Sequence, residues 1–187
     1  MNVLIIPEDQ SLDQYIVKPV VEAMFRDAAI RARVDVLPEP RLRGCTEALN
    51  PGIIAGIVAD NPMADLFLLI VDRDCNREGN DEKAAARQQE HEGKLIACVA
   101  IQEVEVWMLA LHVDLLDTRR FTEVRAHCDP KELWADPLLD RLGRDGPGQG
   151  RKRAMRAIAG NWRSLSGRCP ELAALQAAVV AFRAQQA

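Results

Sequence analysis

The sequence lacks a membrane-length apolar run, CxxC cysteine pairs, internal repeats and an excess of positive charge. Its most apolar run, LFLLIV at 66–71, is far shorter than the roughly 20 residues of a membrane-spanning helix. A strand-like run follows the first residues directly, with no basic leader before it. These absences predict a cytoplasmic protein without a membrane segment.

Cysteine usage points the same way, because the number is odd and the spacing is irregular. Such a set argues against both a disulfide framework and a zinc ribbon. The five cysteines are Cys45, Cys75, Cys98, Cys128 and Cys169.

The net charge of -4 means that the protein as a whole is not a polycation that coats nucleic acid. Contact with nucleic acid would therefore need a local basic region, a bound cation or a partner chain. The 187 residues also contain no Walker A motif, so any ATP-driven control would come from a separate partner.

The order of apolar runs and helix-like patterns predicts an α/β fold. Strand-like runs alternate with helical spacing, which is typical of βαβ units and of a mainly parallel sheet flanked by helices. The expected strands are 3–6, 32–37, 66–71 and 95–100. We expect an α/β core at 1–112 and a helical extension at 113–187, packed on the core rather than folding independently.

Several helix boundaries are open at this stage. Pro19 lies inside the helical pattern of residues 13–28, so this helix either kinks or starts late. Pro137 is expected to break a helix at 131–142, and 143–153 reads as a flexible glycine-rich loop that opens into a basic helix. A last amphipathic helix is predicted from Pro170 to about residue 185.

Acidic residues follow three of the four expected strands. In a parallel sheet the carboxyl ends of the strands share one edge, where ligands bind. We therefore expect these carboxylates to lie close together. The candidates are Glu8, Asp13, Asp72, Asp74, Glu103 and Glu105.

A group of carboxylates at one edge favours a divalent cation. Like charges a few ångströms apart raise each other's pKa, and a hard, oxygen-seeking ion such as Mg²⁺ or Mn²⁺ removes that penalty. If the strand continues through Asp74, its alternation directs Asp72 and Asp74 to the same side. Each residue also has a structural explanation: Asp13 suits a helix N-cap, Glu103 and Glu105 suit a helix first turn, and the Asp pair suits a turn.

A basic stretch follows the glycine-rich loop at 151–156. It suits either a phosphate clamp or a solvated helix face. Lys152 in this stretch is a candidate for stabilising the charge that develops in phosphoryl transfer.

The arrangement resembles the Toprim domain, the metal-binding catalytic module of topoisomerases, primases and OLD-family nucleases. More narrowly, VLIIPEDQSLDQYIVKPVVEAM, LFLLIVDRD, AIQEVEVWMLAL and GRKRAMRAIAGNW are similar to stand-alone bacterial Toprim-like proteins encoded beside ATPases in presumed phage-defence loci. The resemblance covers nearly the whole chain. It implies a Toprim-like, Rossmann-like α/β core that binds one or two Mg²⁺ or Mn²⁺ ions and cleaves DNA or RNA, in some cases with an ATPase partner.

The resemblance also implies roles for individual residues. Glu8 becomes the metal ligand or general acid/base, Asp72 and Asp74 the DxD metal ligands, and Lys152 the catalytic lysine. Candidates for a second metal are Asp13, Glu103 and Glu105. The sequence departs from the common motif in having Asp9 where glycine usually follows the glutamate and in placing the next acid one residue late, at Asp13.

Two other functions remain open. A receiver-like phospho-signalling domain also carries acids after its first and third strands, but it needs a Ser or Thr after strand four and a lysine after strand five. Here Ala100-Ile101-Gln102-Glu103 occupies the strand-four position. The third possibility is a non-catalytic Toprim-like subunit that binds a partner protein.

Overall fold

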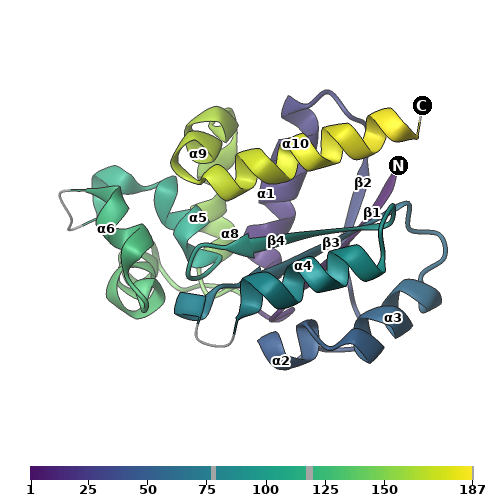
Figure 1. Ribbon diagram of the computed structural model, residues 1–187. Helices are drawn as coiled ribbons and strands as arrows, with labels where there is room; N and C mark the ends of the chain where they lie inside the picture. The colour runs from purple at the N-terminus through teal and green to yellow at the C-terminus, as the bar shows by residue number, and fades with distance from the viewer. Residues whose placement is uncertain (77–78, 117–119, 187) are drawn as a thin grey trace.

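The computed structural model describes residues 1–76, 79–116 and 120–186, and its centre is a four-stranded parallel sheet (Figure 1). The strand order is β2-β1-β3-β4, and every neighbouring pair is parallel. This confirms the predicted α/β, Rossmann-like class. The strands are β1 (Asn2–Pro7), β2 (Arg33–Val36), β3 (Leu66–Asp72) and β4 (Leu95–Ala100).

Helices connect and cover these strands. Within the described residues the α-helices are α1 (Gln14–Asp27), α2 (Cys45–Ala48), α3 (Pro51–Asp60), α4 (Asn80–Glu90), α5 (Glu105–Ala110), α6 (Phe121–Ala126), α7 (Asp136–Leu142), α8 (Arg151–Ala154), α9 (Trp162–Arg168) and α10 (Pro170–Gln185). Short 3₁₀ segments are η1 (Asp74–Asn76), η2 (Val113–Leu115) and η4 (Met155–Ile158), and η3 (Lys131–Ala135) is a π-helix.

The structure defines the helix boundaries at the three prolines named above. Helix α1 begins at Gln14 and contains Pro19, so it does not start after the proline. Pro137 does not break a helix: η3 passes directly into α7, and Pro137 is the second residue of α7. The last helix begins at Pro170, as predicted.

Alternation along the strands produces two apolar layers. On β3, Leu66, Leu68 and Ile70 face one layer, and the residues between them face the other. The first layer contains apolar side chains of α1, α5, α9 and α10, and the second those of α3 and α4. Figure 1 shows α1 and α10 above the sheet and α2, α3 and α4 below it. Because β3 is covered on both faces, all six of its apolar residues are buried.

The chain reverses its direction across the sheet at the β1–β3 pair. It passes from β1 outward to β2, and then returns to the other side of β1 to form β3. The carboxyl ends of β1 and β3 therefore border a topological switch point, the place where open α/β sheets bind ligands.

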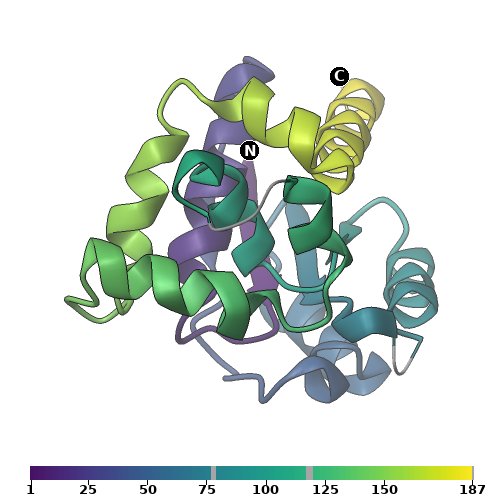
Figure 2. The same ribbon diagram turned by 90° about the vertical axis from the view of Figure 1, so that its left-hand side faces the viewer.

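The segments after β4 lie against this carboxyl edge. Figure 2 shows the green part of the chain, from α5 to α8, in front of the sheet when it is viewed from that side. Their apolar residues belong to the same cluster as one face of the sheet: Val124 of α6, Leu139 of α7 and Ala154 of α8 join Ile5 and Leu68. No helix among the described residues is long and apolar enough to cross a membrane.

One pair of cysteines departs from the sequence-based expectation. Cys75 and Cys128 form a disulfide across 53 residues of sequence, with their Cα atoms 5.5 Å apart. Cys45, Cys98 and Cys169 are free. The scattered spacing gave no sign of this pair, because the fold brings together two loops that are remote in the sequence.

Candidate functional site

Two carboxylates meet at the switch point. Glu8 directly follows β1, and Asp72 is the last residue of the neighbouring strand β3. The Asp72 N–H donates a hydrogen bond of 3.1 Å to Glu8 Oε2. Burial raises the pKa of Glu8, and the charge of Asp74 raises it further, while hydrogen bonds from Asp72 and Cys45 oppose the shift.

Asp72 lies at the centre of the electrostatic coupling. Its Oδ1 accepts a hydrogen bond of 2.8 Å from the Val104 N–H, which ties the end of β3 to the start of α5. Burial raises the pKa of Asp72 well above its usual range. The charges of Asp13, Glu8 and Glu105 raise it further, so carboxylates of the β1–α1 loop and of α5 act on this one group.

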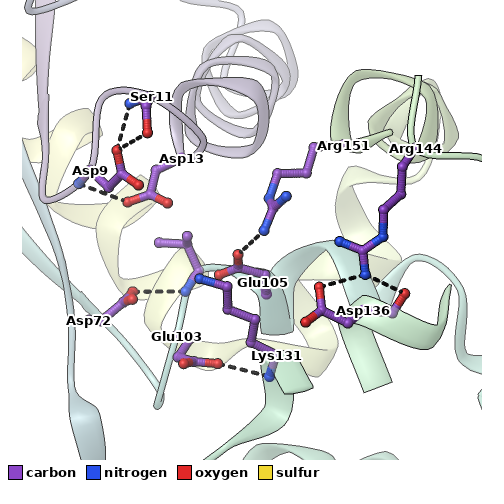
Figure 3. Close-up of polar contacts among 11 residues, drawn as sticks. Asp9, Ser11, Asp13, Asp72, Glu103, Glu105, Lys131, Asp136, Arg144 and Arg151 are labelled. Carbon is purple, nitrogen blue, oxygen red and sulfur yellow. Dashed lines mark hydrogen bonds and ion pairs between the residues drawn. The ribbon is translucent and has the colours of Figure 1, made fainter. Parts of the chain in front are cut away.

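Asp13 belongs to the same cluster rather than to a helix cap. It occupies the N-cap position of α1, but its side chain makes no capping hydrogen bond and instead accepts one of 3.1 Å from the Asp9 N–H (Figure 3). Burial raises the pKa of Asp13 to about 8, with further contributions from the charges of Glu105, Asp9 and Glu8. In the sequence Asp13 comes one residue later than the common motif places the acid, and the fold brings it among the other acids.

The second aspartate of the DxD motif follows a turn rather than the strand alternation we expected. β3 ends at Asp72, and Asp74 has φ 50°, in the left-handed region. Gln102 holds this turn: its carbonyl accepts hydrogen bonds from the N–H groups of Arg73 and Asp74, and its Oε1 accepts one from Cys75. Asp74 still belongs to the acidic edge, because its charge contributes to the raised pKa of Glu8.

The two glutamates after β4 have different environments. Glu105, the first residue of α5, is 2% exposed and forms an ion pair of 2.7 Å with Arg151 (Figure 3). Glu103 is half-buried, and its Oε2 accepts a hydrogen bond of 2.9 Å from the Lys131 N–H. Burial raises the pKa of Glu103 to about 7, and the charge of Glu105 adds to the shift.

The glycine-rich loop before α8 determines the position of Arg151. A Cβ at Gly148 would lie 2.8 Å from the Tyr15 ring of α1, and Gly150 has φ 86°, where a Cβ would lie 2.7 Å from the Gly143 carbonyl oxygen. Only glycine tolerates both constraints. The loop therefore packs against α1 and directs Arg151 toward Glu105.

The other basic residues of this stretch are less involved. Lys152 is exposed, and none of the contacts described joins it to the acids. Arg153 pairs with Asp145. Arg163 and Arg168, which would extend a basic patch, contact Asp27 and the Ala110 carbonyl.

Sequence reasoning missed Lys131, a lysine that does approach the acids. Figure 3 shows its side chain extending from η3 toward the middle of the cluster. Burial lowers the pKa of Lys131 and so does Arg151, but the charges of Glu105, Glu103 and Asp13 raise it, and the balance is upward. The sequence gave no signal for it, because Lys131 lies 28 residues beyond Glu103 in a segment without a motif.

Two further residues contact the end of β3 from the other side. Cys45 places its thiol 3.9 Å from the Asp72 carbonyl, and burial together with the charge of Glu8 raises its pKa. Asn80 is 2% exposed and donates a hydrogen bond of 3.1 Å to that same carbonyl. Its Oδ1 is buried without a hydrogen-bond partner among the described residues.

The carboxylates converge without forming a finished metal site. No group of three or more Asp, Glu, His and Cys side chains within residues 1–76, 79–116 and 120–186 has an arrangement that would hold an ion as it stands. Backbone N–H groups hold Glu8, Asp13 and Asp72 in separate positions. Their donor atoms and their mutually raised pKa values nevertheless fit a hard divalent cation.

An open pocket of about 840 Å³ lies beside the cluster. It is bounded by the loop after β1, including Asp9 and Ser11, and by the loop after β2, with Arg41 and Arg43. Asp9 connects this pocket to the cluster, because its N–H donates a hydrogen bond to Asp13.

Comparison of the chain with protein-family models, with characterised proteins and with solved structures found no match.

Proposed function

We propose that this protein is a Mg²⁺- or Mn²⁺-dependent hydrolase of nucleic-acid phosphodiesters, of the Toprim type that its motifs resemble. The observation that carries the proposal is the coupling at Asp72, whose pKa is raised by burial and by the charges of Asp13 and Glu8, from the loop between β1 and α1, and of Glu105, from α5. Carboxylates gathered in this way make one another harder to ionise, and a bound divalent cation would favour their ionised forms. Their position at the switch point supports a ligand-binding role.

Glu8, Asp72 and Asp74 would hold the cation, with Asp13, Glu103 and Glu105 available for a second one. When bound, the ion would neutralise developing negative charge and favour deprotonation of a bound water. Asp13, with its pKa of about 8, is suited to hold or release a proton near neutral pH. Lys131 and Arg151 supply positive charge on the side of the cluster formed by the extension.

The substrate would enter beside the loops after β1 and β2. Arg41 and Arg43 are exposed at the pocket there and offer positive charge to a phosphate backbone, which the net charge of the whole protein does not. A partner ATPase, if one regulates cleavage, would bring its own nucleotide site, since no Walker A motif is present in this chain.

The described sheet favours this function over a receiver domain. A receiver requires a lysine after a fifth strand, and the parallel sheet formed by the described residues has four strands. The third possibility, a non-catalytic subunit, predicts that purified protein neither binds millimolar metal nor cleaves.

Calorimetry and cleavage assays on one set of proteins test the proposal. Wild type should bind Mn²⁺ and degrade single-stranded DNA, plasmid or RNA. Asp72→Asn should lower both the Mn²⁺ affinity and the cleavage rate by more than about 100-fold. Asp60→Asn is the matched control, because Asp60 is an exposed aspartate at the end of α3 that lines a pocket at the opposite edge of the sheet. Equal rates for wild type and Asp72→Asn, or no metal binding by wild type, would refute the proposal.

A further inference from the structure

The disulfide Cys75–Cys128 joins the two sides of the candidate site. Cys75 directly follows Asp74 in η1, next to the end of β3. Cys128 lies between α6 and η3, three residues before Lys131. The bond therefore connects the strand-end loop of the DxD motif to the segment of the extension that reaches the acids.

On the side of Asp74 and Cys75, the disulfide anchors a backbone conformation that is rare for residues other than glycine. Asp74 and Cys75 both have left-handed φ angles, of 50° and 56°. Such conformations persist where surrounding contacts fix them. The contacts here include the hydrogen bonds to Gln102, among them one of 2.8 Å from the Cys75 N–H to its Oε1, and the disulfide itself.

On the second side, the disulfide holds the entry to η3. The Lys131 N–H donates to Glu103, and the His127 ring packs edge-on against Trp134 with centroids 5.4 Å apart. Only the first of these contacts reaches the acidic cluster. The disulfide adds a covalent connection a few residues away, so it fixes the distance between Asp74 and the backbone that carries Lys131.

Two of the three free cysteines are poor targets for thiol chemistry. Cys98 and Cys169 are buried, and burial raises the pKa of both thiols, to about 12 for Cys169. Thiols of this kind are inert. Cys75 and Cys128 are only half-buried, so a small thiol can reach this pair more readily than the buried cysteines.

We propose that Cys75–Cys128 is a reversible redox clamp on the candidate site. Two molecules of a low-molecular-weight thiol reduce it by exchange: the S–S bond breaks, each cysteine sulfur gains a proton, and the two thiols leave as one disulfide. Oxidation by a low-molecular-weight disulfide reverses the reaction. In the oxidised form Asp74 is held in place. In the reduced form the Asp74 turn and the Cys128–Lys131 segment separate, and metal affinity falls, a consequence that rests on the proposed function.

The test compares oxidised and reduced wild type, so it does not depend on a variant that folds. Mass spectrometry of a non-reduced digest should find the Cys75–Cys128 linkage after treatment with oxidised glutathione. Hydrogen exchange should quicken in peptides covering 73–76 and 128–135 on reduction, and Mn²⁺ affinity should fall by about 10-fold. The double variant Cys75→Ser/Cys128→Ser is the control and should not respond to reductant.

The outcomes separate the two proposals. Absence of the linkage, or equal exchange in both peptides, overturns the clamp. Mn²⁺ affinities within twofold of each other overturn its control of the site. If neither form binds Mn²⁺ while exchange still differs, the clamp stands and the proposed metal-dependent function fails.

Discussion

Two groups of buried carboxylates in this protein are stabilised in opposite ways. Glu171, in the first turn of α10, accepts two hydrogen bonds from the Arg125 guanidinium, at 2.9 and 3.0 Å, and a third from Trp107 Nε1. Among the described residues, Asp72 and Asp13 accept hydrogen bonds from backbone N–H groups, and the charges of other acids raise the pKa of both. The first arrangement satisfies its charge within the chain, and the second leaves negative charge for something else to neutralise.

The difference separates a structural carboxylate from candidate functional ones. A buried ion pair with complete hydrogen bonding contributes to the fold as long as both partners remain. A cluster of like charges costs folding free energy and is retained where it serves another purpose. Substitutions in the two groups should therefore have opposite effects on stability.

The largest loss of stability is expected at Glu171. Glu171→Ala leaves the Arg125 guanidinium largely buried without its partner, which should cost about 3–5 kcal/mol of unfolding free energy. Urea unfolding measures this loss. Glu22→Ala, at an exposed position on α1, should change stability by less than about 0.5 kcal/mol. An unchanged urea midpoint for Glu171→Ala would remove the contrast between the two groups.

Arg151→Met should be the next most damaging change. It leaves Glu105 buried and next to other acids, with a cost of about 3 kcal/mol in the absence of divalent metal. Millimolar Mg²⁺ should restore part of this loss if the cluster binds a cation. Arg153→Met is the control, because its pair with Asp145 is exposed and worth at most about 1 kcal/mol. Equal unfolding curves for the two variants would contradict the role given to Arg151.

Asp13→Asn should instead stabilise the protein in the presence of chelator. The folded pKa of Asp13 is about 8, against the usual 3.8, so between these values the folded chain keeps a proton that the unfolded chain has lost. Wild-type stability therefore falls as pH rises from about 4 to about 8, by up to about 1.4 kcal/mol per pH unit from this group. Asn cannot ionise, so the advantage of the variant should grow over the same range.

Thermal unfolding of both proteins at pH 5, 6, 7 and 8 gives the measurement. Glu22→Gln serves as the exposed control, with no growing advantage expected. A constant difference between Asp13→Asn and wild type across the range would show that Asp13 does not carry this charge penalty.

The fold was predictable from the sequence where the pattern is local. The four apolar runs and the helix from Pro170 correspond to β1–β4 and α10 because strand length, apolar content and proline position act within a few residues. The rule that parallel strands end at a common edge was enough to bring Glu8, Asp13 and Asp72 together.

Other features depend on contacts between remote segments. The turn at Asp74 is fixed by Gln102, and the disulfide links Cys75 to a residue 53 positions away. Arg151 reaches Glu105 because the glycine loop packs on Tyr15. None of these pairings leaves a periodic signal in the sequence.

The smallest effect on stability is expected at the two lysines that are candidates for the site, Lys152 and Lys131. Lys152 is exposed, so Lys152→Met should change unfolding free energy by less than about 0.5 kcal/mol. Lys131→Met should cost somewhat more in chelator, about 1 kcal/mol, since it removes positive charge beside Glu105, Glu103 and Asp13.

Cleavage assays on the same two variants separate their functional roles. The resemblance to Toprim proteins predicts that Lys152→Met is the slower enzyme, whereas the geometry predicts this of Lys131→Met, because a cation stabilises developing charge only from within the site. The loss should be about 10-fold or more for the lysine that serves the reaction and within twofold for the other. If Lys152→Met alone is slow, the loop before α8 must bring Lys152 to the substrate during the reaction. If Lys131→Met alone is slow, the extension supplies part of the catalytic site.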